Sequence, residues 1–86
     1  MTTDYQPIAC GAYDEIEILA MHRTEVEVLS HDQQGVEDCL QGTVVDTSIH
    51  DGAEYLVLQR GDDRHEVRLD RILKIEDSHG VLIWRR

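Results

Sequence analysis

The 86-residue sequence contains no phenylalanine, one proline, two cysteines, one tryptophan and three tyrosines. Without phenylalanine the core must rest on Val, Ile and Leu, which suit β-strands. Two cysteines, Cys10 and Cys39, are too few for a disulfide framework, so we expect reduced thiols in a cytoplasmic protein. The apolar runs are too short to span a membrane, and the polar start Met1–Asp4 predicts no signal peptide.

Basic residues are scarce in the first two thirds of the chain. Residues 1–59 hold twelve Asp or Glu and one basic residue, Arg23, whereas residues 60–86 hold six acidic and seven basic residues. The net charge is −10 at pH 7. Such a field repels nucleic acids and membranes and attracts basic partners, although an acidic surface also serves solubility alone.

No pattern in the sequence is typical of a catalytic or metal-binding site. The five histidines and two cysteines show none of the spacings C-x-x-C, H-x-x-x-H or H-E-x-x-H, and no glycine-rich phosphate loop occurs. Neither cysteine lies in a motif that would activate it as a nucleophile. A chain of this length also has little room for both a core and a deep pocket. We therefore expect a binding protein that is not an enzyme and needs no metal or cofactor.

Residues 11–22 show the periodicity of a short helix, which follows an expected extended arm at residues 1–9. Asp14, Glu15 and Glu17 are expected near the start of this helix, where negative charge suits the helix dipole. Such a helix is too short to be stable alone and needs a platform. Five residues share the face that would contact this platform: Ala12, Ile16, Leu19, Ala20 and Arg23.

The platform is predicted from residues 25–84, where apolar and polar residues alternate with the period of β-strands. Gly42 lies inside a long strand and indicates a bulge or bend. After a kink at Asp70-Arg71, Ile72 and Ile75 resume the apolar set begun by Val67 and Leu69. We predict a single domain over residues 1–86, mostly β, in which five strands form a small bent barrel, because closure removes exposed edges.

The acidic helix is the strongest candidate for a contact surface. Tyr5 and Tyr13 supply the rigid, amphipathic area that anchors interfaces. Asp14, Glu15 and Glu17 can imitate a row of phosphates towards a groove lined by Arg and Lys. The simpler interpretation is a solvated helix face whose charges only favour the dipole.

Two segments of the sequence resemble those of a known family, the Rho-binding antiterminators, which are small bacterial inhibitors of the transcription terminator Rho. The segment YQPIACGAYDEIEILAMHR, residues 5–23, is similar to the N-terminal signature of the family. The segments EYLVLQ and HEVRLDRI, within residues 54–72, resemble its second signature. The two blocks occur in the order, spacing and total length of that family.

The resemblance implies an Sm-like barrel with an N-terminal helix. It also implies that the protein binds the N-terminal, OB-type RNA-binding domain of Rho, blocks RNA loading and suppresses termination. By their place in the motif, Tyr13, Asp14 and Glu17 are the best candidates for partner-binding residues, followed by Tyr5 and Glu15. The protein is expected to be a monomer when free.

Two other functions remain open from the sequence. The basic last third could make the chain an Sm-like RNA-binding module, although Arg64 and Arg68 alternate with Glu66 and Asp70, which indicates a salt-bridged solvent face. Alternatively, the chain could be an acidic adaptor for another basic protein.

Overall fold

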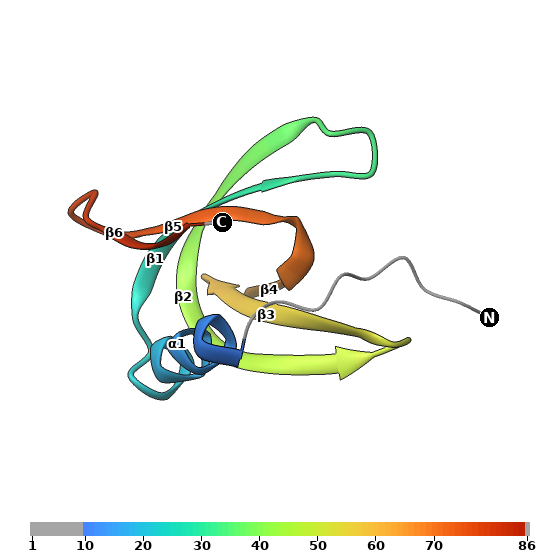
Figure 1. Ribbon diagram of the computed structural model, residues 1–86. Coiled ribbons are helices and arrows are strands. Elements are labelled where there is room, and N and C mark those ends of the chain that lie inside the picture. The colour runs from blue at the N-terminus through green and yellow to red at the C-terminus, as the bar shows by residue number, and fades with distance from the viewer. Residues whose placement is uncertain (1–9, 86) are drawn as a thin grey trace.

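The computed structural model describes residues 10–85, so the expected arm at residues 1–9 lies outside the described residues. One helix is followed by six strands and one turn of 3₁₀ helix (Figure 1). In chain order these are α1 (Cys10–Met21), β1 (Glu25–His31), β2 (Glu37–His50), β3 (Ala53–Arg60), β4 (Asp63–Arg68), η1 (Leu69–Arg71), β5 (Ile72–Asp77) and β6 (Leu82–Arg85). The helix prediction is confirmed to within one residue at each end.

The strands form one antiparallel sheet in the order β4-β3-β2-β1-β5-β6. This confirms a mostly β fold with a short N-terminal helix. Two details differ from the expectation: the strands number six and not five, and the sheet is not closed into a barrel, since β4 and β6 remain its edges. The kink expected at Asp70-Arg71 is η1, which carries the chain from β4 to β5. Strand β5 then pairs with β1 and not with β4.

Strand β2 is long enough to belong to both halves of the sheet. It pairs with β1 over Glu37–Thr43 and with β3 over Thr43–His50, so Thr43 has a partner on each side. The expected bulge is real but lies at Val45, which has no partner in β3. Gly42 has a different role: a Cβ atom there would lie 2.9 Å from the backbone oxygen of Gln59. Gly42 therefore permits the close approach of β3 that curls the sheet.

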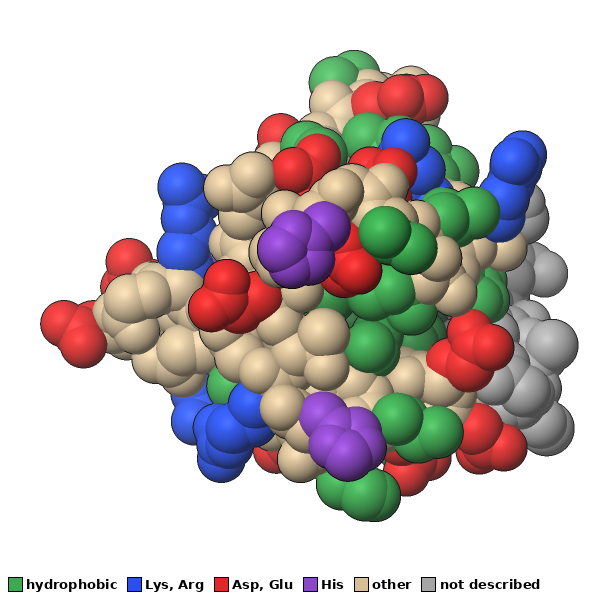
Figure 2. Space-filling view, turned by 90° about the vertical axis from the view of Figure 1, so that its left-hand side faces the viewer, with side chains coloured by type: hydrophobic (Ala, Val, Ile, Leu, Met, Phe, Trp, Pro, Cys, Tyr) green, Lys and Arg blue, Asp and Glu red, His purple; other side chains and the backbone are tan. Residues whose placement is uncertain are grey.

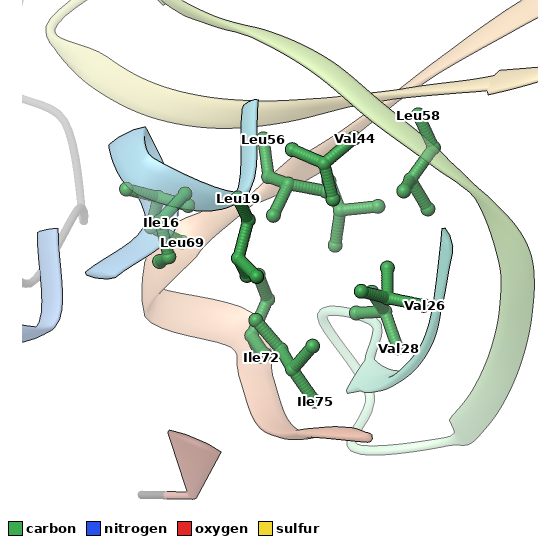
Figure 3. Close-up of a cluster of buried hydrophobic side chains, with 11 residues drawn as sticks. Ile16, Leu19, Val26, Val28, Val44, Leu56, Leu58, Leu69, Ile72 and Ile75 are labelled. Carbon is green, nitrogen blue, oxygen red and sulfur yellow. The ribbon is translucent and has the colours of Figure 1, made fainter. Parts of the chain in front are cut away.

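The core lies inside this curl and joins α1 to the sheet (Figure 3). Figure 3 shows Ile16 and Leu19 of α1 pointing in among side chains from the strands, and Leu69 of η1 belongs to the same cluster. The inward placement predicted for four residues is confirmed, because all are buried: Val67, Leu69, Ile72 and Ile75. Within the described side chains no polar or charged residue is buried, so the core depends on aliphatic packing.

The β1–β2 and β5–β6 hairpins are closed by turns with the same pattern, D-x-x-G-V. Asp32 begins one turn and Asp77 the other. In each, the Oδ1 atom accepts hydrogen bonds from the backbone N–H groups two and four residues later, at 2.8 and 2.9 Å. Gly35 and Gly80 have φ angles of 83° and 80°, which favour glycine because it has no Cβ atom. The turns of the β1–β2 and β5–β6 hairpins thus depend on equivalent aspartates, Asp32 and Asp77.

Gly42→Ala is expected to destabilise the fold, because the new methyl group would meet the backbone oxygen of Gln59, which cannot move without shifting β3. The expected loss is about 1–3 kcal/mol in the free energy of unfolding, measured by urea denaturation. Gln41→Ala, a change at an exposed neighbour in the same strand, is the control and should cost less. Equal stability of the Gly42→Ala variant and the parent would contradict this role for Gly42.

Asp77→Asn is expected to lower the melting temperature near neutral pH and to lose this difference in acid. The N–H groups of Val81 and then of His79 hold the pKa of the Asp77 carboxyl below its ordinary value. Its contribution to stability is therefore present above the ordinary aspartate pKa and is lost as the pH falls through the lowered value. Thermal unfolding followed by circular dichroism between about pH 7 and pH 3 measures this. Asp62→Asn, at an exposed turn, should show no such pH-dependent difference from the parent.

Candidate functional site

Helix α1 is attached to the sheet by one face. Ile16 and Leu19 are 1% and 8% exposed and belong to the core, and Ala20 packs against it. Burying each of the two larger side chains contributes about 1.5–3 kcal/mol, which a helix of 12 residues needs because its isolated form is marginal. The predicted anchoring by Ile16, Leu19 and Ala20 is thus confirmed.

The predicted place of Arg23 on this face is wrong. The helix ends at Met21, and Arg23 is exposed with a left-handed φ of 49°. The N–H of Arg23 donates to the carbonyl oxygen of Ala20, and the N–H of Thr24 donates to that of Leu19. This is the Schellman arrangement that satisfies the last carbonyl groups of a helix. The helical period ends at Ala20, because the helix ends at Met21 and Arg23 has a left-handed backbone conformation.

Tyr13 lies at the junction between α1 and β2. Its side chain is half-buried and packs against the core, and its hydroxyl group donates a hydrogen bond of 3.5 Å to Oγ1 of Thr47. The residue predicted to contact a partner therefore also helps to fix the helix on the sheet. Tyr5, its predicted companion, lies outside the described residues.

Asp14, Glu15 and Glu17 are exposed on α1, and none of them makes a side-chain hydrogen bond or ion pair with any residue of the described part of the chain. The expected stabilisation by the helix dipole is wrong. The helix begins at Cys10, so its first turn holds no acidic residue, and the dipole effect falls off within that turn. Within residues 10–85, no internal partner accounts for these three carboxylates.

The outermost ridge of α1 combines acidic with apolar residues. Asp14, Ile18 and Met21 are spaced i, i+4 and i+7, so they share the stripe opposite Ile16 and Leu19. Ile18 is 51% and Met21 is 74% exposed. The sequence prediction missed both residues, although the helical period that put Ile16 and Leu19 inside already left Ile18 outside. Figure 2 shows one face of the molecule on which acidic side chains are widely spread, with hydrophobic side chains exposed between them.

A shallow groove separates α1 from β2. Its lining residues come from one turn of the helix and from the bulged part of the strand: Glu17, Ala20, Met21, Val45, Asp46 and Thr47. The groove extends the exposed ridge onto the sheet. We define the α1 surface as Asp14, Glu17, Ile18 and Met21 together with Val45 across this groove.

The basic residues of the last third are partly neutralised. Arg68 makes a bidentate ion pair with Asp70, at 2.8 and 2.7 Å, and both side chains are largely covered. Lys74 lies 3.6 Å from Glu76. Arg64 differs from the expectation, because its Nε donates to the amide oxygen of Gln59 and not to a carboxylate. These contacts offset part of the local positive charge and argue against a continuous basic groove, although the Arg68–Asp70 pair is covered and does not form the predicted solvent face.

A polar cluster that the sequence prediction missed joins β2, β3 and β4. The His50 ring stacks on Tyr55 with centroids 4.1 Å apart, and its Nε2 lies 3.0 Å from Oε2 of Glu66. Ser48 donates to the same oxygen. The contact with Glu66, and then that with Asp51, raises the pKa of His50, whereas Ser48 and His50 lower the pKa of Glu66. The cluster links the edge strand β4 to β2 across β3.

Cys39 is exposed, and its Sγ donates to Oε1 of Glu27 at 3.2 Å. Partial burial and then this hydrogen bond raise the pKa of the thiol, which works against a nucleophilic thiolate. No group of three or more His, Cys, Asp or Glu that could hold a metal is present in residues 10–85. Over the same residues, no helix has the length and hydropathy to cross a membrane.

A protein-family model matches most of the chain. The model described as "Modulator of Rho-dependent transcription termination (ROF)" matches residues 7–81. Two curated relatives, both called "Protein rof", are from Escherichia coli (strain K12) and Shigella flexneri. Each is 32% identical over 72 residues, which cover 84% of this chain and 81% of the relative.

Glu66→Gln is expected to lower the pKa of His50, because the hydrogen bond to Glu66 is the largest cause that raises it. NMR titration of the histidine side chains measures the change. Glu37→Gln, at an exposed residue outside the cluster, should leave His50 unchanged. If Glu66→Gln also left it unchanged, the Glu66–His50 contact would not be formed in solution.

Proposed function

Since this chain belongs to the family of modulators of Rho-dependent transcription termination (ROF), we propose that it binds Rho at its RNA-binding domain and blocks the loading of RNA. Rho-dependent termination is then suppressed by occupation of the RNA site. In this proposal the chain acts in the cytoplasm, is a monomer when free, and uses no catalysis, metal or direct contact with nucleic acid.

One observation carries the proposal: α1 presents exposed carboxylates that have no partner within the described chain. A site that binds RNA must be basic because RNA is a polyanion. A protein of net charge −10 is attracted to such a site and repelled by RNA itself. Asp14 and Glu17 lie on the ridge and at the groove, so they are our first candidates for the contact, and Glu15, on the other flank, is second.

Tyr13 is a further candidate for the contact, because it lies at the junction between α1 and β2. It is held between α1 and β2 by packing and by its hydrogen bond to Thr47, so the part of its ring that remains exposed is presented in a fixed position. A side chain that is already ordered loses little entropy when a partner binds. Tyr5 remains a proposed contact by its place in the sequence motif alone.

The alternative of an RNA-binding module has less support. Arg68, whose side chain is largely covered, already pairs with the carboxylate of Asp70. Its charge is therefore not free to bind a phosphate group of RNA. A mobility-shift titration with short C-rich and U-rich RNAs distinguishes the two functions. Tight direct binding of RNA at ordinary salt would overturn our proposal in favour of the module. Capture of another basic protein in place of Rho would favour the adaptor.

Changing both Asp14 and Glu17 to Lys is expected to weaken binding to Rho by about 100-fold, because like charges brought together cost several kcal/mol and each 1.4 kcal/mol is a factor of ten. Isothermal titration with intact Rho, and competition with labelled RNA, measure the effect. The control changes Asp62 and Asp63 to Lys, which alters the net charge equally at the exposed β3–β4 turn. If the helix variant still competes as well as its parent, α1 is not the contact surface.

A further inference from the structure

Helix α1 carries more exposed apolar surface than attachment to the sheet requires. Ile16 and Leu19 already fill the core side. On the opposite ridge Ile18 is 51% and Met21 is 74% exposed, and neither belongs to the core cluster nor packs against it. Hydrophobic side chains that stand together between charges on a surface mark interaction sites more often than isolated ones do.

The bulge in β2 extends this apolar ridge. Val45 is the residue that has no partner in β3, and a bulge of this kind redirects the side chain it carries. Val45 lines the same groove as Met21, between the helix and the strand. Asp14, Glu17 and Asp46 stand along this strip, and all three are exposed. The α1 surface is therefore an apolar strip with carboxylates at its border.

This combination corresponds to the two chemical parts of single-stranded RNA. Proteins that bind single strands offer basic side chains to the phosphates and aromatic platforms to the bases. Carboxylates can take the places of the phosphates, whereas apolar side chains can take those of the bases. Methionine is suited to an aromatic platform, because its thioether sulfur makes favourable contacts with aromatic rings.

We propose that Ile18, Met21 and Val45 occupy the base-binding platforms of Rho's RNA-binding domain, while Asp14 and Glu17 occupy the places of phosphates. The proposal rests on the proposed function, since it takes Rho as the partner. A second copy of this chain is a poor occupant, because two molecules of net charge −10 repel each other and the strip itself is bordered by acids.

The relative size of the two contributions explains why the apolar strip matters. Exposed ion pairs are individually weak. At physiological salt, the attraction between exposed charges is largely screened beyond a separation of roughly 8 Å. Contacts between charges at the rim of an interface mainly raise the rate of association. Buried apolar anchors near the centre mainly slow dissociation and are insensitive to salt. The carboxylates therefore attract the partner, and the apolar strip retains it.

The test is the double variant Ile18→Gln and Met21→Gln, which leaves the net charge unchanged and places a good helix former at both positions. Binding to intact Rho is measured by isothermal titration at about 50 and 300 mM salt. We expect affinity at least about tenfold weaker at both concentrations. The slope of log Kd against log salt should match that of the parent, whereas the double change of Asp14 and Glu17 to Lys should alter the slope.

The matched control replaces two other exposed apolar residues outside α1, Ile49 and Val81, which are 69% and 59% exposed, by Gln. This variant should bind as the parent does. Met21→Gln alone, at the most exposed site, is a second test variant in case the double variant unfolds. If the parent binds Rho and the Gln variants of α1 bind equally well, the apolar strip has no role and the proposed function stands. If the parent itself does not bind Rho, both proposals fail.

Discussion

The fold depends on strand β2, whose two halves pair with different strands. Strand β2 gives its first half to β1 and its second half to β3, and Thr43 belongs to both. A straight strand could not do this and still enclose a core, so the backbone must bend where the two halves meet. Gly42 lets β3 approach, and the extra residue Val45 relieves the register. Because α1 packs on this bent part of β2, the curvature that closes the core also positions the helix.

Local sequence patterns predicted the parts of this fold better than their assembly. The helix was found to within a residue because Ile16 and Leu19 follow its period, and Val67 and Leu69 were placed inward because strands alternate. Strand closure was not predictable in this way. Whether β4 or β5 pairs with β1 depends on the direction in which η1 turns the chain, and alternation carries no information on pairing between distant segments. The open sheet therefore emerged only from the structure.

For the candidate site too, the sequence showed the residues of the helix but not the features that depend on tertiary structure. The carboxylates of α1 were visible in the sequence, but the structure shows that the first turn of the helix holds none of them. The exposure of Ile18 and Met21 depends on which face the sheet covers, and the groove beside them depends on a bulge whose position at Val45 the local pattern did not give. The His50–Glu66 contact joins residues on strands that are not neighbours, so it too is a product of tertiary structure.

The Schellman end of α1 has a consequence for motion. The sheet is held by backbone hydrogen bonds along every pair of strands, whereas α1 is joined to it by side chains and by the short link from Arg23 to Thr24, whose carbonyl accepts from Val44. Local opening of a fold begins where few contacts hold an element, so the packing of Ile16 and Leu19 is what keeps α1 closed on the sheet. A partner that contacts both α1 and Val45 of β2 connects the helix to the sheet. A partner bound to this surface therefore also holds α1 on the sheet.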